Sequence, residues 1–280
     1  MSHEANAQRE LWQADFATII AHFANIRKKT ILELIHENHD LQDLADKTYE
    51  IVDVLAFNGD IDTGSEDLWE EGGDFEWPAA ATKVKVSSTD DTNDKAAATG
   101  AKEVTVYGLD ADYAEISEAE DPDGQSGNET TALFLRINKV LVTSAGVLRS
   151  NQGIIYVGTG TLTAGVPQTK VHAKMAAGRG IAALGSYCVP QGKTAYLLEV
   201  KASCALDAVI GIEIMKKPQA GAEQIVDVFQ MHQGQPNGLL HRYEADIPVF
   251  EEKTDIKIRG TTSADNAIVA GKLVLLVVDN

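Results

Sequence analysis

Cysteine and proline are scarce in this chain, which has 2 Cys and 7 Pro among 280 residues. Two cysteines in a chain of this length do not make a disulfide framework, so we expect Cys188 and Cys204 to be buried thiols in strands. No run approaches the ~18 apolar residues that a membrane span requires, and the first ten residues lack the apolar core of a secretory signal. The sequence therefore predicts a protein that stays in the cytoplasm where it is made, with no membrane partner.

Basic residues are also few: 24 Lys and Arg stand against 42 Asp and Glu, a formal net charge of −18. Most of the excess lies in two windows, residues 53–76 and 110–129, which contain many acids and no Lys or Arg. Such windows repel a phosphate backbone, so we expect no nucleic-acid partner. They favour a basic protein surface, a cation or plain solubility.

Period-two alternation of apolar residues, typical of strands, begins after Pro78 and continues to the end of the chain. Turn signals such as Asp121-Pro-Asp-Gly124 separate the runs. Many short strands without intervening helical runs favour a mainly β chain, an antiparallel β-sandwich that is jelly-roll-like. The expected strands are residues 82–87, 103–107, 113–117, 132–142, 153–157, 169–173, 194–202, 209–215, 224–229, 255–260 and 273–278.

Helical spacing of apolar residues precedes these strands and predicts a helical N-terminal arm. Asp40 can cap a second helix, so we expect helices over residues 8–37 and 41–56. The apolar stripe of such an arm must be covered, either by the β domain of the same chain or by another subunit, and we favour another subunit. The residues of the arm predicted to dock on a subunit or partner are Phe16, Ile20, Phe23, Ile26 and Leu34.

A connector rich in Gly, acids and aromatic residues joins the arm to the β domain. Large aromatic rings gain free energy when they leave water, so Trp69, Phe75 and Trp77 are predicted to lie against the β domain or to dock on a neighbouring subunit. The expected organisation is a helical arm, a connector, and a β domain that forms one sandwich or two (81–175 and 176–280). The bounds of the three parts are residues 1–56, 57–80 and 81–280.

One loop has carboxylates at calcium-loop spacing. Asp60, Asp62 and Glu71 match positions one, three and twelve, but Gly64 stands where a ligand belongs and Ser65 where the turn glycine belongs. We therefore expect a solvated or subunit-docking loop and no metal.

Other candidate metal-binding and catalytic residues also lack the spacing that their chemistry requires. His36 with His39, and His232 with His241, lack zinc-ligand spacing, and Ser186 lacks the Gly-x-Ser-x-Gly elbow of a serine nucleophile. The acids of the two windows have no apolar surroundings that would raise a pKa towards catalysis. The sequence predicts no catalytic residue, no cofactor and no enzyme.

Several stretches between residue 57 and the end of the chain have a distinctive sequence. They are Asn58-Gly-Asp-Ile-Asp-Thr-Gly64, Asp67-Leu-Trp-Glu-Glu-Gly-Gly-Asp-Phe-Glu-Trp-Pro78, Gly100-Ala-Lys-Glu-Val-Thr-Val-Tyr-Gly-Leu-Asp-Ala-Asp-Tyr-Ala-Glu-Ile-Ser-Glu118, Thr131-Ala-Leu-Phe-Leu-Arg-Ile-Asn-Lys-Val140, Tyr187-Cys-Val-Pro-Gln-Gly-Lys-Thr-Ala-Tyr196 and Lys253-Thr-Asp-Ile-Lys-Ile-Arg-Gly-Thr261. Together they resemble poorly characterised virion structural proteins of tailed bacteriophages. The similarity covers roughly residues 57–280 and leaves out the arm.

The resemblance implies a virion building block, assembled in the host cytoplasm, whose partners are major capsid or tail proteins. We expect a homo-oligomer, with a trimer favoured, that acts as a capsid decoration (cement) or head-fibre protein and binds through its N-terminal arm. One alternative is a tail or neck accessory, such as a fibre adaptor. Another is a carbohydrate-binding receptor module, because aromatic side chains such as Trp69, Trp77, Tyr107 and Tyr113 stack on sugars.

Overall fold

The structure is a computed structural model of the whole chain, and it describes residues 48–205, 210–231, 238–244 and 246–280. The predicted arm up to residue 47, including its five docking residues, lies outside this range. Residues 1–48 and Tyr49–Asn280 form two separate units, and only the second is described below. Among the described residues every regular element is a strand, and no helix is long and apolar enough to cross a membrane.

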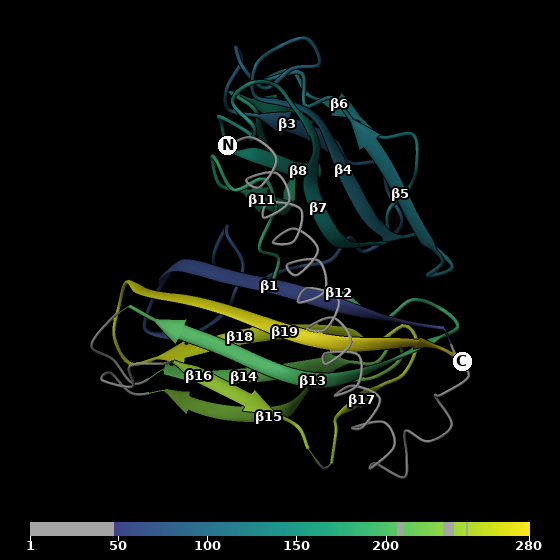
Figure 1. Ribbon diagram of the computed structural model, residues 1–280, viewed down its shortest axis with the longest axis vertical. Coiled ribbons are helices and arrows are strands. Elements are labelled where there is room, and N and C mark those ends of the chain that lie inside the picture. The colour runs from purple at the N-terminus through teal and green to yellow at the C-terminus, as the bar shows by residue number, and fades with distance from the viewer. Residues whose placement is uncertain (1–47, 206–209, 232–237, 245) are drawn as a thin grey trace, which may run out of the picture. The chain divides into compact units, whose positions relative to one another are not determined.

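Antiparallel strands make up this second unit (Figure 1). The first half of the chain contributes Tyr49–Ile61 (β1), Gly64–Asp67 (β2), Lys85–Ser88 (β3), Ala101–Leu109 (β4), Glu115–Glu120 (β5), Asn128–Glu129 (β6), Arg136–Ala145 (β7), Ile155–Thr159 (β8), Leu162–Thr163 (β9) and Val166–Pro167 (β10). The second half contributes Lys170–Met175 (β11), Ser186–Cys188 (β12), Lys193–Cys204 (β13), Ile210–Lys217 (β14), Gln224–Met231 (β15), Leu239–Arg242 (β16), Val249–Phe250 (β17), Asp255–Thr262 (β18) and Ala267–Asp279 (β19).

These strands form five sheets. The β4 sheet has the order β5-β4-β7, and the β8 sheet has the order β11-β8-β3-β6. The β19 sheet has the order β1-β19-β13-β16 with β17 on β13, and the β18 sheet has the order β12-β18-β14-β15 with β2 on β18. Strands β9 and β10 form a separate hairpin. The prediction of a mainly β chain with antiparallel sheets is confirmed.

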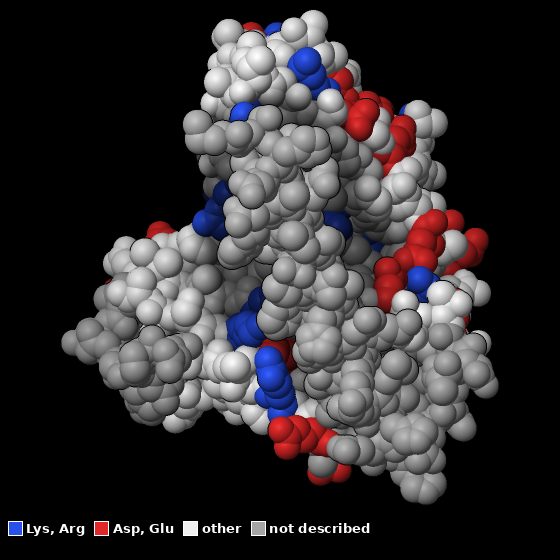
Figure 2. Space-filling view, in the orientation of Figure 1, with Lys and Arg blue, Asp and Glu red and all other residues white. Residues whose placement is uncertain are grey.

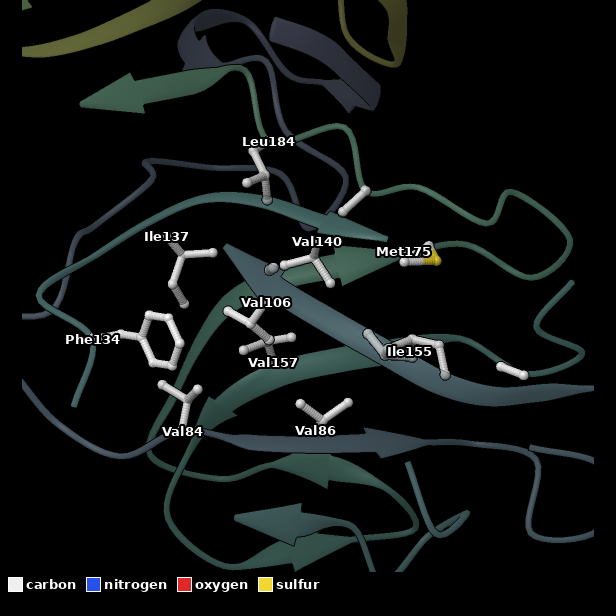
Figure 3. Packing of buried hydrophobic residues seen from close by; sticks show 14 residues of the cluster. Val84, Val86, Val106, Phe134, Ile137, Val140, Ile155, Val157, Met175 and Leu184 are labelled. Atoms are coloured by element: carbon white, nitrogen blue, oxygen red, sulfur yellow. The ribbon is translucent and has the colours of Figure 1, made fainter. Parts of the chain in front are cut away.

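The β4 and β8 sheets pack face to face over an apolar core. Val106 and Val140 from the β4 sheet meet Val86 and Val157 from the β8 sheet, and Phe134 closes one end (Figure 3). All five side chains are buried. Alternation places the four valines on one face of their strands, which is the pattern that predicted these strands from the sequence.

The β19 and β18 sheets also face each other. A Cβ added at Gly271 in β19 would lie 3.1 Å from Cδ1 of Ile258 in β18, and one added at Gly260 would lie 2.7 Å from Cδ1 of Ile61 in β1. Both contacts cross from one sheet to the other. Two glycines therefore let the backbones approach closely where the sheets cross.

The prediction of a helix over residues 41–56 is wrong for residues 49–56, which begin strand β1. Val52 and Leu55 fit the helical spacing that predicted this helix, yet β1 pairs with β19 from Tyr49 to Ile61. The partner strand lies more than 200 residues away in the sequence, so local spacing could not reveal it. Long-range pairing thus overrides the local pattern.

The strands also differ from the expected jelly roll. A jelly roll places eight strands in two sheets, whereas the described strands are spread over five separate sheets. Separate small sheets that pack face to face suggest a propeller-like arrangement more than one jelly-roll sandwich. Strand pairing across long sequence distances, which alternation does not encode, accounts for the difference.

Candidate functional site

The aromatic residues of the connector stack on one another inside the chain. The rings of Trp69 and Phe75 meet edge to face with centroids 5.1 Å apart, and those of Phe75 and Trp77 do so at 4.7 Å. The indole N–H of Trp69 donates to the Gly73 carbonyl at 3.1 Å, and the Phe75 amide donates to Oδ2 of Asp67 at 2.8 Å. The connector is therefore fixed by its own hydrogen bonds.

This arrangement restricts the docking role predicted for the three aromatic residues. Trp69 is 4% exposed and Phe75 is 3% exposed, whereas Trp77 is half-buried. Docking through these residues stays a prediction, but rings that the chain itself covers offer a partner little surface. The covered rings of Trp69 and Phe75 also leave no open face on which a sugar could stack.

Arg136 contacts the aromatic rings and also forms an ion pair. Its guanidinium lies 5.3 Å from the ring centroid of Trp77 and 5.5 Å from that of Tyr113. Its Nε and second terminal nitrogen donate to the two carboxylate oxygens of Asp255 at 2.7 and 3.0 Å. Although burial opposes the charge, the Asp255 carboxylate raises the pKa of Arg136. The pair links β7 of the β4 sheet to β18 of the β18 sheet.

Cys188 lies beside this pair without the surroundings of a nucleophile. Its amide donates to Oδ1 of Asn138 at 2.9 Å, and the Asn138 side-chain amide donates to the Cys188 carbonyl at 2.8 Å. Burial, followed by the charge of Asp255, raises the pKa of the Cys188 thiol. A buried thiol of this kind is inert. Both cysteines are free thiols, as the sequence predicts, with Cys188 buried and Cys204 half-buried.

Bases from β11 and the turn after it neutralise the connector's acids. Glu76 pairs with Lys170 at 2.6 Å, Glu71 pairs with Lys174 at 3.0 Å, and Glu70 pairs with Arg179 at 3.0 Å. Burial raises the pKa of Glu70, against the opposing effects of the Ala176 amide and Arg179. Much of the first acidic window is thus engaged within the chain.

Asp67 extends this network on the β18 sheet. Its carboxylate binds Nζ of Lys257 at 2.9 Å and Nε of Arg259 at 3.2 Å, and Lys257 also contacts Glu223 at 3.2 Å. The calcium-like spacing of Asp60, Asp62 and Glu71 gains no support, since Glu71 pairs with Lys174. Across the described parts of the chain, no group of three His, Cys, Asp or Glu side chains could hold a metal ion.

Part of the second acidic window forms the open edge of the β4 sheet, because Glu115–Glu120 make up β5, whereas Glu129 lies in β6 of the β8 sheet. Strand β5 pairs with β4 alone among the described strands, and acidic side chains gather along it on the face shown in Figure 2. Glu115 pairs with Lys193 at 2.8 Å, and the other described contact with a base is Glu129 with Lys83 at 4.0 Å. The described residues offer no ion-pair partner to Asp110, Asp112, Glu118, Glu120, Asp121 or Asp123. We call this surface, formed by the acids on and beside β5, the β5 acidic edge.

Two acids of this edge point towards the core side of their sheet. Glu118 lies opposite the buried Val106, and Glu120 lies opposite the buried Val104. The Glu118 carboxylate accepts hydrogen bonds from the amides of Thr131 at 2.9 Å and Ala132 at 2.7 Å. Charged side chains that point inward on an edge strand are a common protection against edge-to-edge aggregation.

The remaining residues weighed from the sequence do not assemble a reactive centre. Ser186 is buried in β12, and His241 packs between Phe229 and Tyr243, with ring centroids 5.0 and 4.6 Å away. His36, His39 and His232 lie outside the described residues. Sequence reasoning missed the Arg136–Asp255 pair, because the two residues lie on strands 119 positions apart.

Comparison with known proteins gives little guidance. No family model matches the chain, and no curated protein matches it. A solved structure titled "Structure of infectious bursal disease virus Gt strain" is similar at a TM-score of 0.16 and 12% sequence identity, over 84% of this chain and 73% of that chain. A likeness at this TM-score carries no argument about fold or function.

Proposed function

We propose that the chain is a structural component of a bacteriophage virion, a trimeric capsid decoration or head-fibre protein that binds other virion proteins. The sequence resemblance motivates the proposal. The β5 acidic edge supports it most, because an open strand edge lined with carboxylates suits a basic protein surface and repels nucleic acid. The proposal does not require a jelly-roll topology.

Charge use in the rest of the molecule also fits a structural role. The Arg136–Asp255 pair, the Asp67 network and the connector's ion pairs each join separate segments of the chain. Charges held in this way stabilise a fold but are not free for chemistry. A tail or neck accessory is the second form of the same proposal.

Particle labelling tests where the protein acts. Purified virions are probed with an antibody against this chain and imaged at low resolution, with particles from a phage that lacks the gene as the control. We expect label on the head in several copies. Label confined to the neck or tail selects the accessory form, and absence of the chain from purified virions contradicts the proposal.

Added positive charge tests the docking surface. The double variant Asp112→Lys with Ala119→Lys adds positive charge to exposed positions of the β5 acidic edge, and Asp62→Lys with Ala80→Lys is the control, with the same two substitutions at exposed positions outside this edge. We expect the first variant to reduce incorporation into particles about tenfold, since like charges repel across an interface. Equal incorporation of both variants would exclude this edge as the docking surface.

A further inference from the structure

Strand β15 is an open edge of the β18 sheet (Figure 1). It pairs with β14 on one side, and none of the described strands pairs with its other side. Ile225 and Val228 of this strand are 54% and 51% exposed. Apart from the Val228 amide, no main-chain group of β15 bonds to a described residue outside the β14 pairing. An edge of this kind can accept another extended strand.

The composition of β15 favours such pairing. Five of its eight residues are apolar, and it has no Pro, Lys or Arg. Its one charged residue is Asp227, whose Oδ2 accepts a hydrogen bond from the Tyr243 hydroxyl at 2.7 Å and whose Oδ1 accepts one from the Val228 amide at 2.8 Å. The carboxylate is therefore engaged within the chain. Strand β15 thus lacks the free charges that commonly keep edge strands apart.

The other long edge strands are closed, engaged or strongly charged. The free side of β1 is bonded by the Gly185 amide and the Leu68 carbonyl, and the free side of β7 is bonded by residues 180–182. Strand β11 carries Lys170 and Lys174, which hold the connector through ion pairs. Two copies of β5 side by side would bring carboxylates together, which is destabilising. Among the described edge strands of six residues or more, β15 has none of these obstacles.

We propose that β15 pairs with β15 of a second copy of this chain, in antiparallel orientation about a two-fold axis. Such a contact is isologous, because each copy contributes the same residues. It would join the β18 sheets of the two copies into one continuous sheet. The open main chain gains hydrogen-bond partners, and Ile225 and Val228 gain apolar neighbours from the other copy.

This inference goes beyond the proposed function. A two-fold contact joins copies in pairs, whereas a trimer needs a three-fold contact elsewhere on the surface. The β5 acidic edge, which the proposed function uses, belongs to a different sheet. Pairing through β15 is measured on the isolated protein and virion binding on particles, so that either can fail without the other.

Sedimentation of the full-length protein tests the pairing. Val228→Lys places a positive charge on the edge of each copy, and lysine on an edge strand opposes pairing. The control is Val147→Lys, the same substitution at an 80% exposed valine in the turn after β7. At high concentration we expect Val228→Lys to have half the mass of the unmodified protein and Val147→Lys to match it. Equal masses of Val228→Lys and the unmodified protein overturn the proposal.

Hydrogen exchange of the unmodified protein supplies a measurement that needs no variant to fold. We expect the amides of Gln224–Met231 to exchange at least threefold more slowly in concentrated than in dilute protein, because a partner strand protects them. The amides of the edge strand Glu115–Glu120 serve as the control and should not change. Exchange in β15 that is equally fast at both concentrations overturns the proposal.

Disulfide trapping distinguishes self-pairing from pairing with another strand. Val228→Cys and Gln230→Cys are made in a Cys204→Ser background and oxidised singly and as a mixture, while the buried Cys188 is retained. Antiparallel self-pairing brings position 228 or 230 of one copy beside position 228 or 230 of the other, so we expect a linked dimer in at least one sample. Val147→Cys in the same background is the control and should stay unlinked. Slowed exchange in β15 without a linked dimer in any sample would mean that another strand covers this edge and would overturn the proposal.

Discussion

At the scale of single residues, buried charge is used to fix loops. Asp94 is fully buried, and its carboxylate accepts hydrogen bonds from the Ser88 hydroxyl at 2.7 Å and from the amides of Ala101 at 2.9 Å and Gly153 at 2.8 Å. The Gln152 amide donates to both carboxylate oxygens, at 2.9 and 3.1 Å. One side chain thus joins the loop before β4 to the loop before β8.

Asp94→Asn tests this role. The substitution replaces an acceptor oxygen with an NH₂ group that faces N–H donors, so buried donors lose their partners. We expect the free energy of unfolding to fall by about 2–4 kcal/mol, measured by urea denaturation. The control Asp112→Asn, at an exposed position, should change it by less than about 0.5 kcal/mol. Equal effects of the two variants would contradict the assigned role of Asp94.

At the scale of elements, alternation predicted most of the strands. The expected strands at residues 194–202, 224–229, 255–260 and 273–278 all lie within β13, β15, β18 and β19. Alternation succeeds there because one face of each strand is buried. It fails for β1, whose apolar residues fit helical spacing equally well. Pairing with β19 decides between helix and strand for these residues, and the local sequence contains no signal for that pairing.

The candidate surface was predictable only in part. The acids of residues 110–129 are visible in the sequence, and the structure places them along the edge strand β5 and its neighbouring loops. The acids of residues 53–76 looked equally available, yet Lys170, Lys174 and Arg179 neutralise several of them. These bases lie about a hundred positions further along the chain, so composition alone could not separate the two windows.

The two inward acids of β5 should respond to pH in opposite directions. Although partial burial opposes its charge, the amides of Thr131 and Ala132 hold the pKa of Glu118 below its ordinary value. Burial and the neighbouring Glu118 raise the pKa of Glu120. A lowered pKa means that charged Glu118 adds stability above pH ~4.5, and this contribution is lost as the pH falls through the folded-state pKa. Charged Glu120 costs stability, and the cost disappears as acid protonates it.

Glutamine variants separate these contributions. Glu118→Gln should lower the melting temperature at pH 7 and reduce its fall between pH 5 and pH 3, because the group that loses stability in acid is gone. Glu120→Gln should raise the melting temperature slightly at pH 7. Each shift should stay within about 4 °C, because both side chains are partly exposed at the edge of the sheet and water screens their charges. Thermal melts at pH 3 to 7 measure both effects. Melting temperatures that shift in the same direction at pH 7 in the two variants would contradict the opposite contributions of Glu118 and Glu120.

At the scale of the whole described unit, one buried ion pair connects two packed pairs of sheets. Arg136 belongs to the pair made by the β4 and β8 sheets, and Asp255 belongs to the pair made by the β19 and β18 sheets. Asn138 and Cys188 add two hydrogen bonds between the same pairs. The side chains of Arg136 and Asp255 are 13% and 7% exposed, so the pair is largely removed from solvent screening.

Arg136→Leu should therefore weaken the connection between the two pairs of sheets as well as the overall fold. Removal of one partner leaves a buried carboxylate unpaired, which typically costs 3–5 kcal/mol. We expect calorimetry to show a lower melting temperature and two resolved transitions where the unmodified protein shows one, because each pair of sheets has its own apolar core. The control Lys139→Leu, on the same strand but over the half-exposed ring of Tyr107, should keep a single transition. A single transition at an unchanged temperature in Arg136→Leu would mean that the other contacts between the pairs are sufficient without this ion pair.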